Sequence, residues 1–144
     1  MRRSTWTVWT RSALVLVPAV LGAALVIAPI WRDTVRLEAF RERVLDLPLP
    51  PRTRSVYSTD RDVVFGPNLV GGSGSSCDYR VRLTLRTALT PQEIQRFYRN
   101  VSVAGAETRA EISLFFEDEE VAGGHRFVLE AYDSHDWDGD WRCA

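Results

Sequence analysis

The sequence contains no lysine and very little cysteine or histidine. All eighteen basic residues are arginine, which we attribute to a GC-rich bacterial genome rather than to a binding function. Only two cysteines and two histidines occur, with no CxxC pair and no cysteine and histidine at the spacing of metal ligands. The sequence therefore carries no zinc signature, and we predict no metal, no cofactor and no catalytic residues.

A concentrated basic region is also missing. Residues 32–106 hold twelve arginines against eight acidic residues, whereas residues 107–144 hold three arginines against eleven. Nucleic-acid-binding domains present a basic patch or stripe, and a charge that is divided in this way does not form one. We therefore predict that nucleic acid is not a partner.

One long apolar run stands near the N-terminus. Residues 13–30 are eighteen consecutive residues without a charge or a side-chain hydrogen-bonding group. A helix of about twenty residues reaches roughly 30 Å, which is the thickness of a bilayer's hydrocarbon core. Trp6 and Trp9 precede the run and Trp31 follows it, where indole rings favour the headgroup region. We predict a transmembrane helix over residues 13–31, with the lipid bilayer as its partner.

The same segment has some features of a cleaved secretory signal. Basic residues precede it, and the small residues 22–24 resemble a cleavage site. The apolar run continues to Ile30 and is longer than the apolar region of most signal peptides, and we therefore favour a retained signal anchor. Arginines are balanced on the two flanks, so their count does not set the orientation.

The two cysteines indicate the orientation. Cys77 and Cys143 lie far apart, as expected for one structural disulfide in an oxidising compartment. Two free thiols in a cytoplasmic domain are the alternative. We predict a cytoplasmic tail (residues 1–12) and an extracytoplasmic C-terminal domain, held at the cell membrane by a single span.

A second helical pattern comes directly after the span. Residues 33–46 place apolar side chains near helical spacing, and the proline cluster at residues 47–51 cannot continue a helix. The sequence leaves open whether this apolar side packs on the domain, on the bilayer or on a second copy. The side chains on this apolar side are Val35, Leu37, Phe40, Val44 and Leu45. We treat residues 32–51 as a juxtamembrane helix with a proline-rich linker.

Residues 52–144 have the pattern of one α+β domain, a small antiparallel sheet packed on one helix. Residues 77–87 alternate between apolar and polar side chains, as in a strand with one buried face. Residues 90–93 form a capping box that starts a helix reaching to about Asn100. Further strands are predicted at residues 53–59 and 62–65, as a hairpin or two bent edge strands, and at residues 110–117 and 126–133, as an antiparallel hairpin. The side chains expected to point inward in the second hairpin are Ile112, Leu114, Phe116, Phe127, Leu129 and Ala131.

Three arginines share the polar face of the strand at residues 77–87. Arg80, Arg82 and Arg86 are a candidate surface for an anionic ligand. Acidic residues on the later strands offer cross-strand partners, and we favour an ordinary solvated sheet face. These partners are Glu111, Glu117 and Glu130.

The C-terminal residues 134–144 are rich in aspartate and tryptophan. Asp136, Asp138 and Asp140 resemble the first ligands of an EF-hand loop, but the required glycine and the twelfth-position glutamate are missing. We expect a turn at residues 138–139, with Trp137 and Trp141 packed on the domain.

These patterns predict a membrane-anchored extracytoplasmic module that is not an enzyme and that binds a protein or supports an envelope complex. One alternative is a small metal-dependent hydrolase that uses His135 with Asp136, Asp138 and Asp140. Another is a sensor of anions or small ligands that uses the arginine face.

Overall fold

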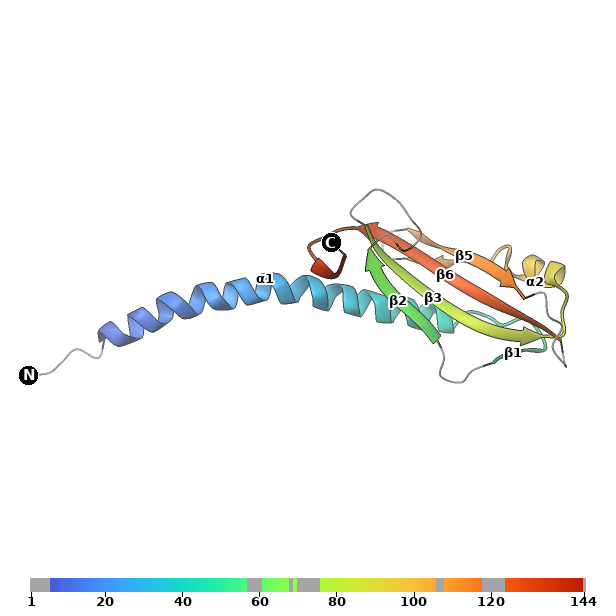
Figure 1. Cartoon of the computed structure of the whole chain (residues 1–144), viewed down its shortest axis with the longest axis horizontal. Helices are drawn as coiled ribbons and strands as arrows, with labels where there is room; N and C mark the ends of the chain where they lie inside the picture. The colour runs from blue at the N-terminus through green and yellow to red at the C-terminus, as the bar shows by residue number, and fades with distance from the viewer. Residues whose placement is uncertain are drawn as a thin grey trace, which may run out of the picture.

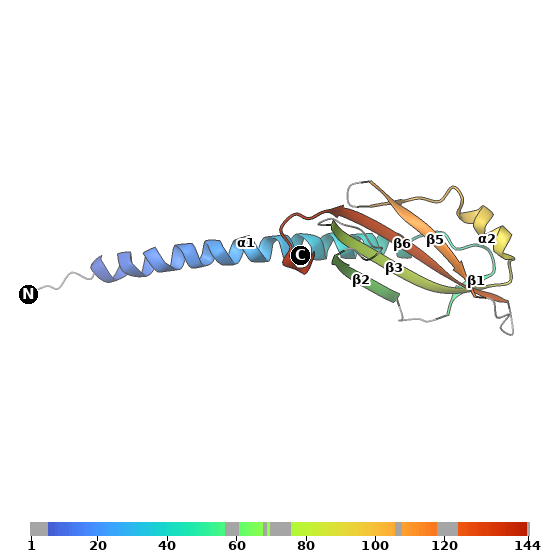
Figure 2. The same ribbon diagram turned by 45° about the horizontal axis from the view of Figure 1, so that its top comes forward.

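A computed structural model describes residues 6–56, 61–67, 69, 76–105, 108–117 and 124–143, with side chains from residue 17 onward except that of residue 61. The arrangement is α+β: one long helix, a curled antiparallel sheet and a short second helix (Figures 1 and 2). In chain order the elements are α1 (Trp6–Leu45), β1 (Thr53–Ser55), β2 (Arg61–Pro67), β3 (Ser76–Thr87), α2 (Pro91–Tyr98), β4 (Val103–Ala104), β5 (Arg109–Phe116), β6 (His125–Asp136) and the 3-10 helix η1 (Trp141–Cys143).

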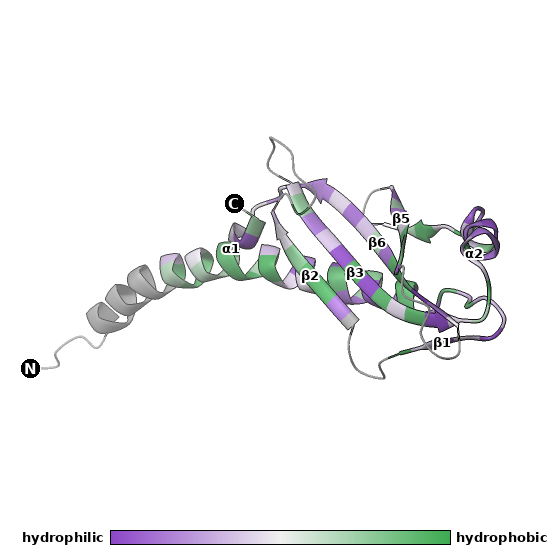
Figure 3. Cartoon of the chain, turned by 45° about the vertical axis from the view of Figure 1, so that its right-hand side comes forward, coloured by the Kyte–Doolittle hydropathy of each residue, from purple (hydrophilic) through white to green (hydrophobic). Residues whose placement is uncertain are grey.

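Helix α1 runs through the predicted span and the predicted juxtamembrane helix without interruption, and both Pro18 and Pro29 lie inside it. At about 1.5 Å per residue its 40 residues reach about 60 Å. Its N-terminal part extends away from the sheet (Figures 1 and 3) and is long and apolar enough to cross a membrane. The large apolar side chains on this part are each more than half exposed: Val17, Val20, Leu21, Leu25, Val26 and Ile27.

The C-terminal part of α1 belongs to the core of the domain. Phe40 and Val44 are fully buried, and Leu37 packs against the same cluster. The apolar side of this segment therefore packs on the domain. The prediction that Val35 shares that side is wrong, since its side chain is 52% exposed. The position one turn before Leu37 on the buried side is Asp33, which is completely buried.

The sheet is built around the long antiparallel pair β3 and β6, and its strand order is β1-β3-β6-β5-β4. Strands β1 and β2 both pair with β3, β1 near its end and β2 along its first half. They are therefore two segments along one edge and not a hairpin. Residues 57–59, the end of the first predicted strand, lie outside the described residues.

The predicted hairpin of β5 and β6 is confirmed, and its register joins the expected inward-facing residues. Ile112 pairs with Ala131, Leu114 with Leu129, and Phe116 with Phe127. Strand β6 continues to Asp136, three residues beyond the predicted end. This extension brings residues 134–136 against the start of β3.

Helix α2 begins at the predicted capping box, in which Thr90 and Glu93 each bind the other's backbone. Ile94 and Tyr98 are buried against the sheet. The Tyr98 hydroxyl donates to the carbonyl oxygen of Pro48 at 3.3 Å, so this helix also holds the proline-rich linker. Burial raises the pKa of Tyr98 to about 12.

Candidate functional site

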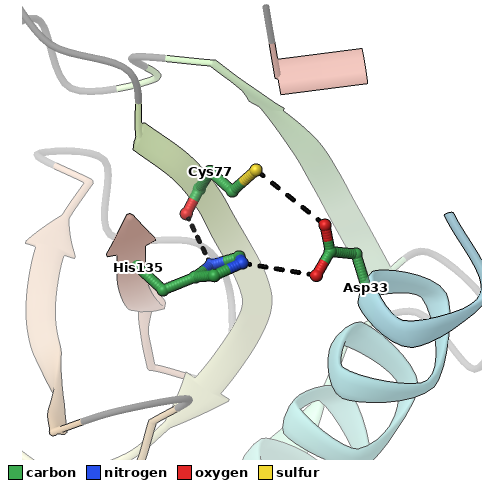
Figure 4. Close-up of side chains that lie close together, drawn as sticks. All are labelled: Asp33, Cys77 and His135. Carbon is green, nitrogen blue, oxygen red and sulfur yellow. Dashed lines mark hydrogen bonds and ion pairs between the residues drawn. The ribbon is translucent and has the colours of Figure 1, made fainter. Parts of the chain in front are cut away.

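Polar side chains from three elements meet where α1 crosses the sheet. We call this cluster the polar junction and define it as Asp33, Arg36, Tyr79, His135 and Asp138. Asp33 and Arg36 come from α1, Tyr79 from β3 and His135 from β6, and Asp138 follows β6. Figure 4 shows Asp33 reaching from the helix toward His135 and toward Cys77 on β3. Arg36 binds Asp138, which lies 102 positions later in the chain, so the junction joins side chains that are far apart in the sequence.

Asp33 is the centre of the junction. Its Oδ1 atom accepts a hydrogen bond from the Tyr79 hydroxyl at 3.3 Å and lies 3.4 Å from the nearer Arg36 nitrogen. The same Arg36 nitrogen lies 2.8 Å from Asp138 Oδ2. Burial raises the pKa of Tyr79, and the neighbouring Asp33 charge raises it further, so this phenol stays a neutral donor. A buried carboxylate requires such partners, because an unpaired buried charge costs several kcal/mol.

His135 lies between two acceptors. Its Nδ1 atom is 3.1 Å from the carbonyl oxygen of Cys77, and a carbonyl only accepts, so Nδ1 carries a proton. Its Nε2 atom lies 3.3 Å from Asp33 Oδ1 and 4.0 Å from Asp138 Oδ2. Among the described residues Nε2 has no hydrogen bond of good geometry. The ring also stacks on Tyr79, which fixes its orientation.

The cluster in Figure 4 has the residue types of a metal site, with one ligand atom from each of Asp33, Cys77 and His135 within 4.8 Å of the others. The Cys77 sulfur, however, lies 2.10 Å from the Cys143 sulfur, at disulfide distance. A disulfide sulfur has no proton to donate to Asp33 Oδ2, 3.9 Å away, and no thiolate to offer a metal. Asp33 and His135 then remain as two ligands, one fewer than a catalytic zinc site uses.

The chain that follows β6 bends back onto α1. We call residues 137–143 the C-terminal hook. Asp138 Oδ2 lies 2.6 Å from Arg32, and one terminal nitrogen of Arg142 donates to the carbonyl oxygen of Ile30 at 3.0 Å. Gly139 has a φ of 105°, and a Cβ there would lie 3.6 Å from Pro29 Cγ. The hook therefore contacts the helix over residues 29–36.

Asp140 and Arg142 form a paired charge inside the hook. The Arg142 side chain donates to both carboxylate oxygens, and its backbone amide donates to Oδ1. Burial alone raises the pKa of Asp140, but these hydrogen bonds outweigh it and hold the pKa below its ordinary value. The hydrogen bond to Asp140 raises the pKa of Arg142 in turn.

The tryptophans of the hook do not pack on the domain as the sequence predicted. Trp137 is 47% exposed and Trp141 is 65% exposed. The Trp137 indole donates its N–H to the carbonyl oxygen of Asp140, which holds the ring at the outside of the bend. The aspartates of the metal-dependent hydrolase alternative have different surroundings. Asp138 and Asp140 each pair with an arginine, whereas Asp136 is exposed at the end of β6.

The three arginines of the candidate ligand face also have different neighbours. Arg82 lies 2.5 Å from Glu130, and Arg80 lies within 4.0 Å of Glu130 and of Asp62. Arg86 aligns with Arg54 on one side and Arg126 on the other. Of the two other expected partners, Glu117 pairs with Arg126, and Glu111 is aligned with Tyr132. Asp78, expected on the same wet face, is buried and accepts from Ser134 and from the Leu69 amide.

We expect Asp140 to contribute stability that is lost in acid. Because its folded-state pKa is lowered, this contribution is present above the unfolded carboxyl pKa of about 3.9 and disappears as the pH falls through the folded value. Denaturant unfolding of Asp140→Asn should therefore show a smaller loss of stability below about pH 4 than the unaltered chain. Asp46→Asn, which changes an exposed carboxylate, is the control. Equal acid sensitivity of all three proteins would contradict the expectation.

Asp33 is the central residue of the candidate site, and sequence patterns missed it. Periodicity assigns charged residues to water, yet Asp33, Leu37, Phe40 and Val44 recur at the helical spacing of one face. That spacing was the one available signal.

Comparison with known proteins does not identify a relative. No family model, no curated protein and no solved structure matches this chain. A function for the chain is therefore inferred from the geometry of its described residues.

Proposed function

We propose that this chain is a single-pass, membrane-anchored module of the cell envelope, with its N-terminus in the cytoplasm and its domain outside. The module is not an enzyme; it holds a protein partner or supports an envelope complex. The observation that supports the proposal most directly is the continuity of α1, whose exposed apolar part and buried core part form one helix.

The exposed apolar part of α1 supports the proposal that this helix inserts in the bilayer. Soluble proteins rarely leave a contiguous apolar surface of this size in water, and a membrane is the usual solvent for one. Trp31 at its C-terminal end is 71% exposed, in agreement with a position among lipid headgroups. The first charges after it, Arg32 and Asp33, bind within the domain. The domain therefore begins where the apolar surface stops.

The closed polar junction argues for a structural role. Asp33 is fully buried and His135 is 3% exposed, so a substrate has no access to either group. The nearby Cys77 sulfur is held at disulfide distance from Cys143. The charges of the junction link helix and sheet, and removing one of them would leave its partner in the buried cluster uncompensated.

The topology is tested with a reporter fused after Ala144. We expect a reporter that works only after export to be active and a reporter that works only in the cytoplasm to be inactive, because the predicted disulfide needs an oxidising compartment. The fusion should stay in the membrane pellet at alkaline pH. Activity of the cytoplasmic reporter would overturn the orientation.

Mass spectrometry of the membrane-extracted chain tests whether the anchor is retained. We expect a peptide that joins Trp31 to the residues before Leu25. A new N-terminus at Leu25 or Pro29 would instead identify a cleaved signal and a released domain.

A further inference from the structure

We infer that the C-terminal hook is a second membrane contact, and that Trp137 and Trp141 insert into the phospholipid headgroup layer beside Trp31. The inference rests on the proposed span and adds to it a surface that sets how the domain sits on the bilayer. Its partner is the lipid surface itself.

The level of the hook along α1 is fixed by contacts. Gly139 approaches Pro29, Arg142 binds the carbonyl oxygen of Ile30, and Arg32 binds Asp138. Figures 1 and 2 show this segment against the middle of α1, nearer the N-terminal half of the helix than any labelled strand. The apolar run ends at Ile30. The hook therefore lies where a span over residues 13–31 leaves the hydrocarbon.

The exposed rings of the hook are the kind that this layer favours. Trp31, Trp137 and Trp141 are 71%, 47% and 65% exposed, so each keeps apolar surface uncovered by the chain. Tryptophan is enriched at the membrane–water interface because its ring is amphipathic. In water, the exposed apolar surface of these three indoles would be unfavourable if it is contiguous.

The charges of the hook permit this position. Asp138 is bound by Arg32 and Arg36, and Asp140 is bound by Arg142. The arginines neutralise the carboxylates, which would be costly to bring close to the hydrocarbon unpaired. The Arg142 guanidinium also lies 4.5 Å from the centre of the Phe65 ring, so it is held to the domain. The hook is thus a bend with paired carboxylates and exposed indoles.

Depth-dependent fluorescence quenching tests the inference on the full chain in phosphatidylcholine–phosphatidylglycerol vesicles. In one variant Trp6, Trp9 and Trp31 are replaced by Phe, so that emission comes from Trp137 and Trp141 alone. In the matched variant Trp6, Trp9, Trp137 and Trp141 are replaced, which leaves Trp31 as the reference for the end of the span. Each is measured with lipids that carry a nitroxide at the headgroup or deep in the acyl chain.

We expect headgroup nitroxides to quench the Trp137 and Trp141 pair to an extent comparable with Trp31, and more strongly than deep acyl nitroxides do. Emission at shorter wavelength than in detergent-free buffer should accompany the quenching. If Trp31 is quenched but the pair is not, and the pair stays open to acrylamide, the span holds and the hook contact is overturned. If Trp31 is not quenched either, the proposed anchoring fails and the inference fails with it.

Discussion

Replacing Asp33 with Asn should lower the free energy of unfolding by about 3 kcal/mol, because removing one partner of a buried charge cluster leaves the others uncompensated. Asparagine keeps the size of the side chain and so limits the loss to charge and hydrogen bonding. The groups left behind are the Tyr79 hydroxyl, His135 Nε2 and, in part, Arg36. Thermal and denaturant unfolding of the full chain in detergent micelles measures the change.

Two comparisons separate the junction from a general effect of helix charge. Glu42→Gln removes an exposed carboxylate from the same helix and should change stability by less than about 0.5 kcal/mol. In a His135→Gln background, Asp33→Asn should cost less than it does alone, because part of the interaction is already lost. Additive effects of the two substitutions would show that Asp33 and His135 are not coupled.

Replacing Cys77 and Cys143 together with Ala should cost about 4 kcal/mol, since a bond across a sequence separation of 66 removes that much loop entropy from the unfolded chain. The bond joins the start of β3 to η1, so its loss also loosens the hook. A melting curve of the full chain, recorded with and without a reductant, gives the measurement.

The reductant also provides the control. It should lower the stability of the unaltered chain to that of the Cys77→Ala, Cys143→Ala variant and leave the variant unchanged. Denatured, unreduced protein should not react with a thiol reagent. Full reaction would show that both thiols are free, and it would remove the main support for an extracytoplasmic domain.

Local spacing was enough to predict most of the sheet. The alternation in residues 77–87 identified the buried side of β3, and the capping box placed the start of α2. The facing apolar residues of β5 and β6 were found because side chains alternate strictly along a strand. These elements depend on neighbours within a few positions, which a sequence displays directly.

The site depended on contacts that local patterns do not contain. From the sequence, Asp33 is expected to be the solvated residue at the end of a membrane span. It is buried because the fold brings Tyr79 and His135 to it, and these residues are 46 and 102 positions away. Trp141 was expected to pack on the domain because large aromatic residues are highly buried on average. Its exposure results from the bend that places the hook against α1.

The contact of Arg36 with Asp138, 102 positions later, has a consequence for how the domain is made. Helix α1 supplies Phe40 and Val44 to the core, yet the sheet that covers them is complete only after β6 has joined β3. The C-terminal part of α1 is therefore synthesised long before its partners in the sheet exist. Contacts of such high sequence separation slow folding, and during that interval Asp33 lacks its partners and the apolar side of the helix is uncovered.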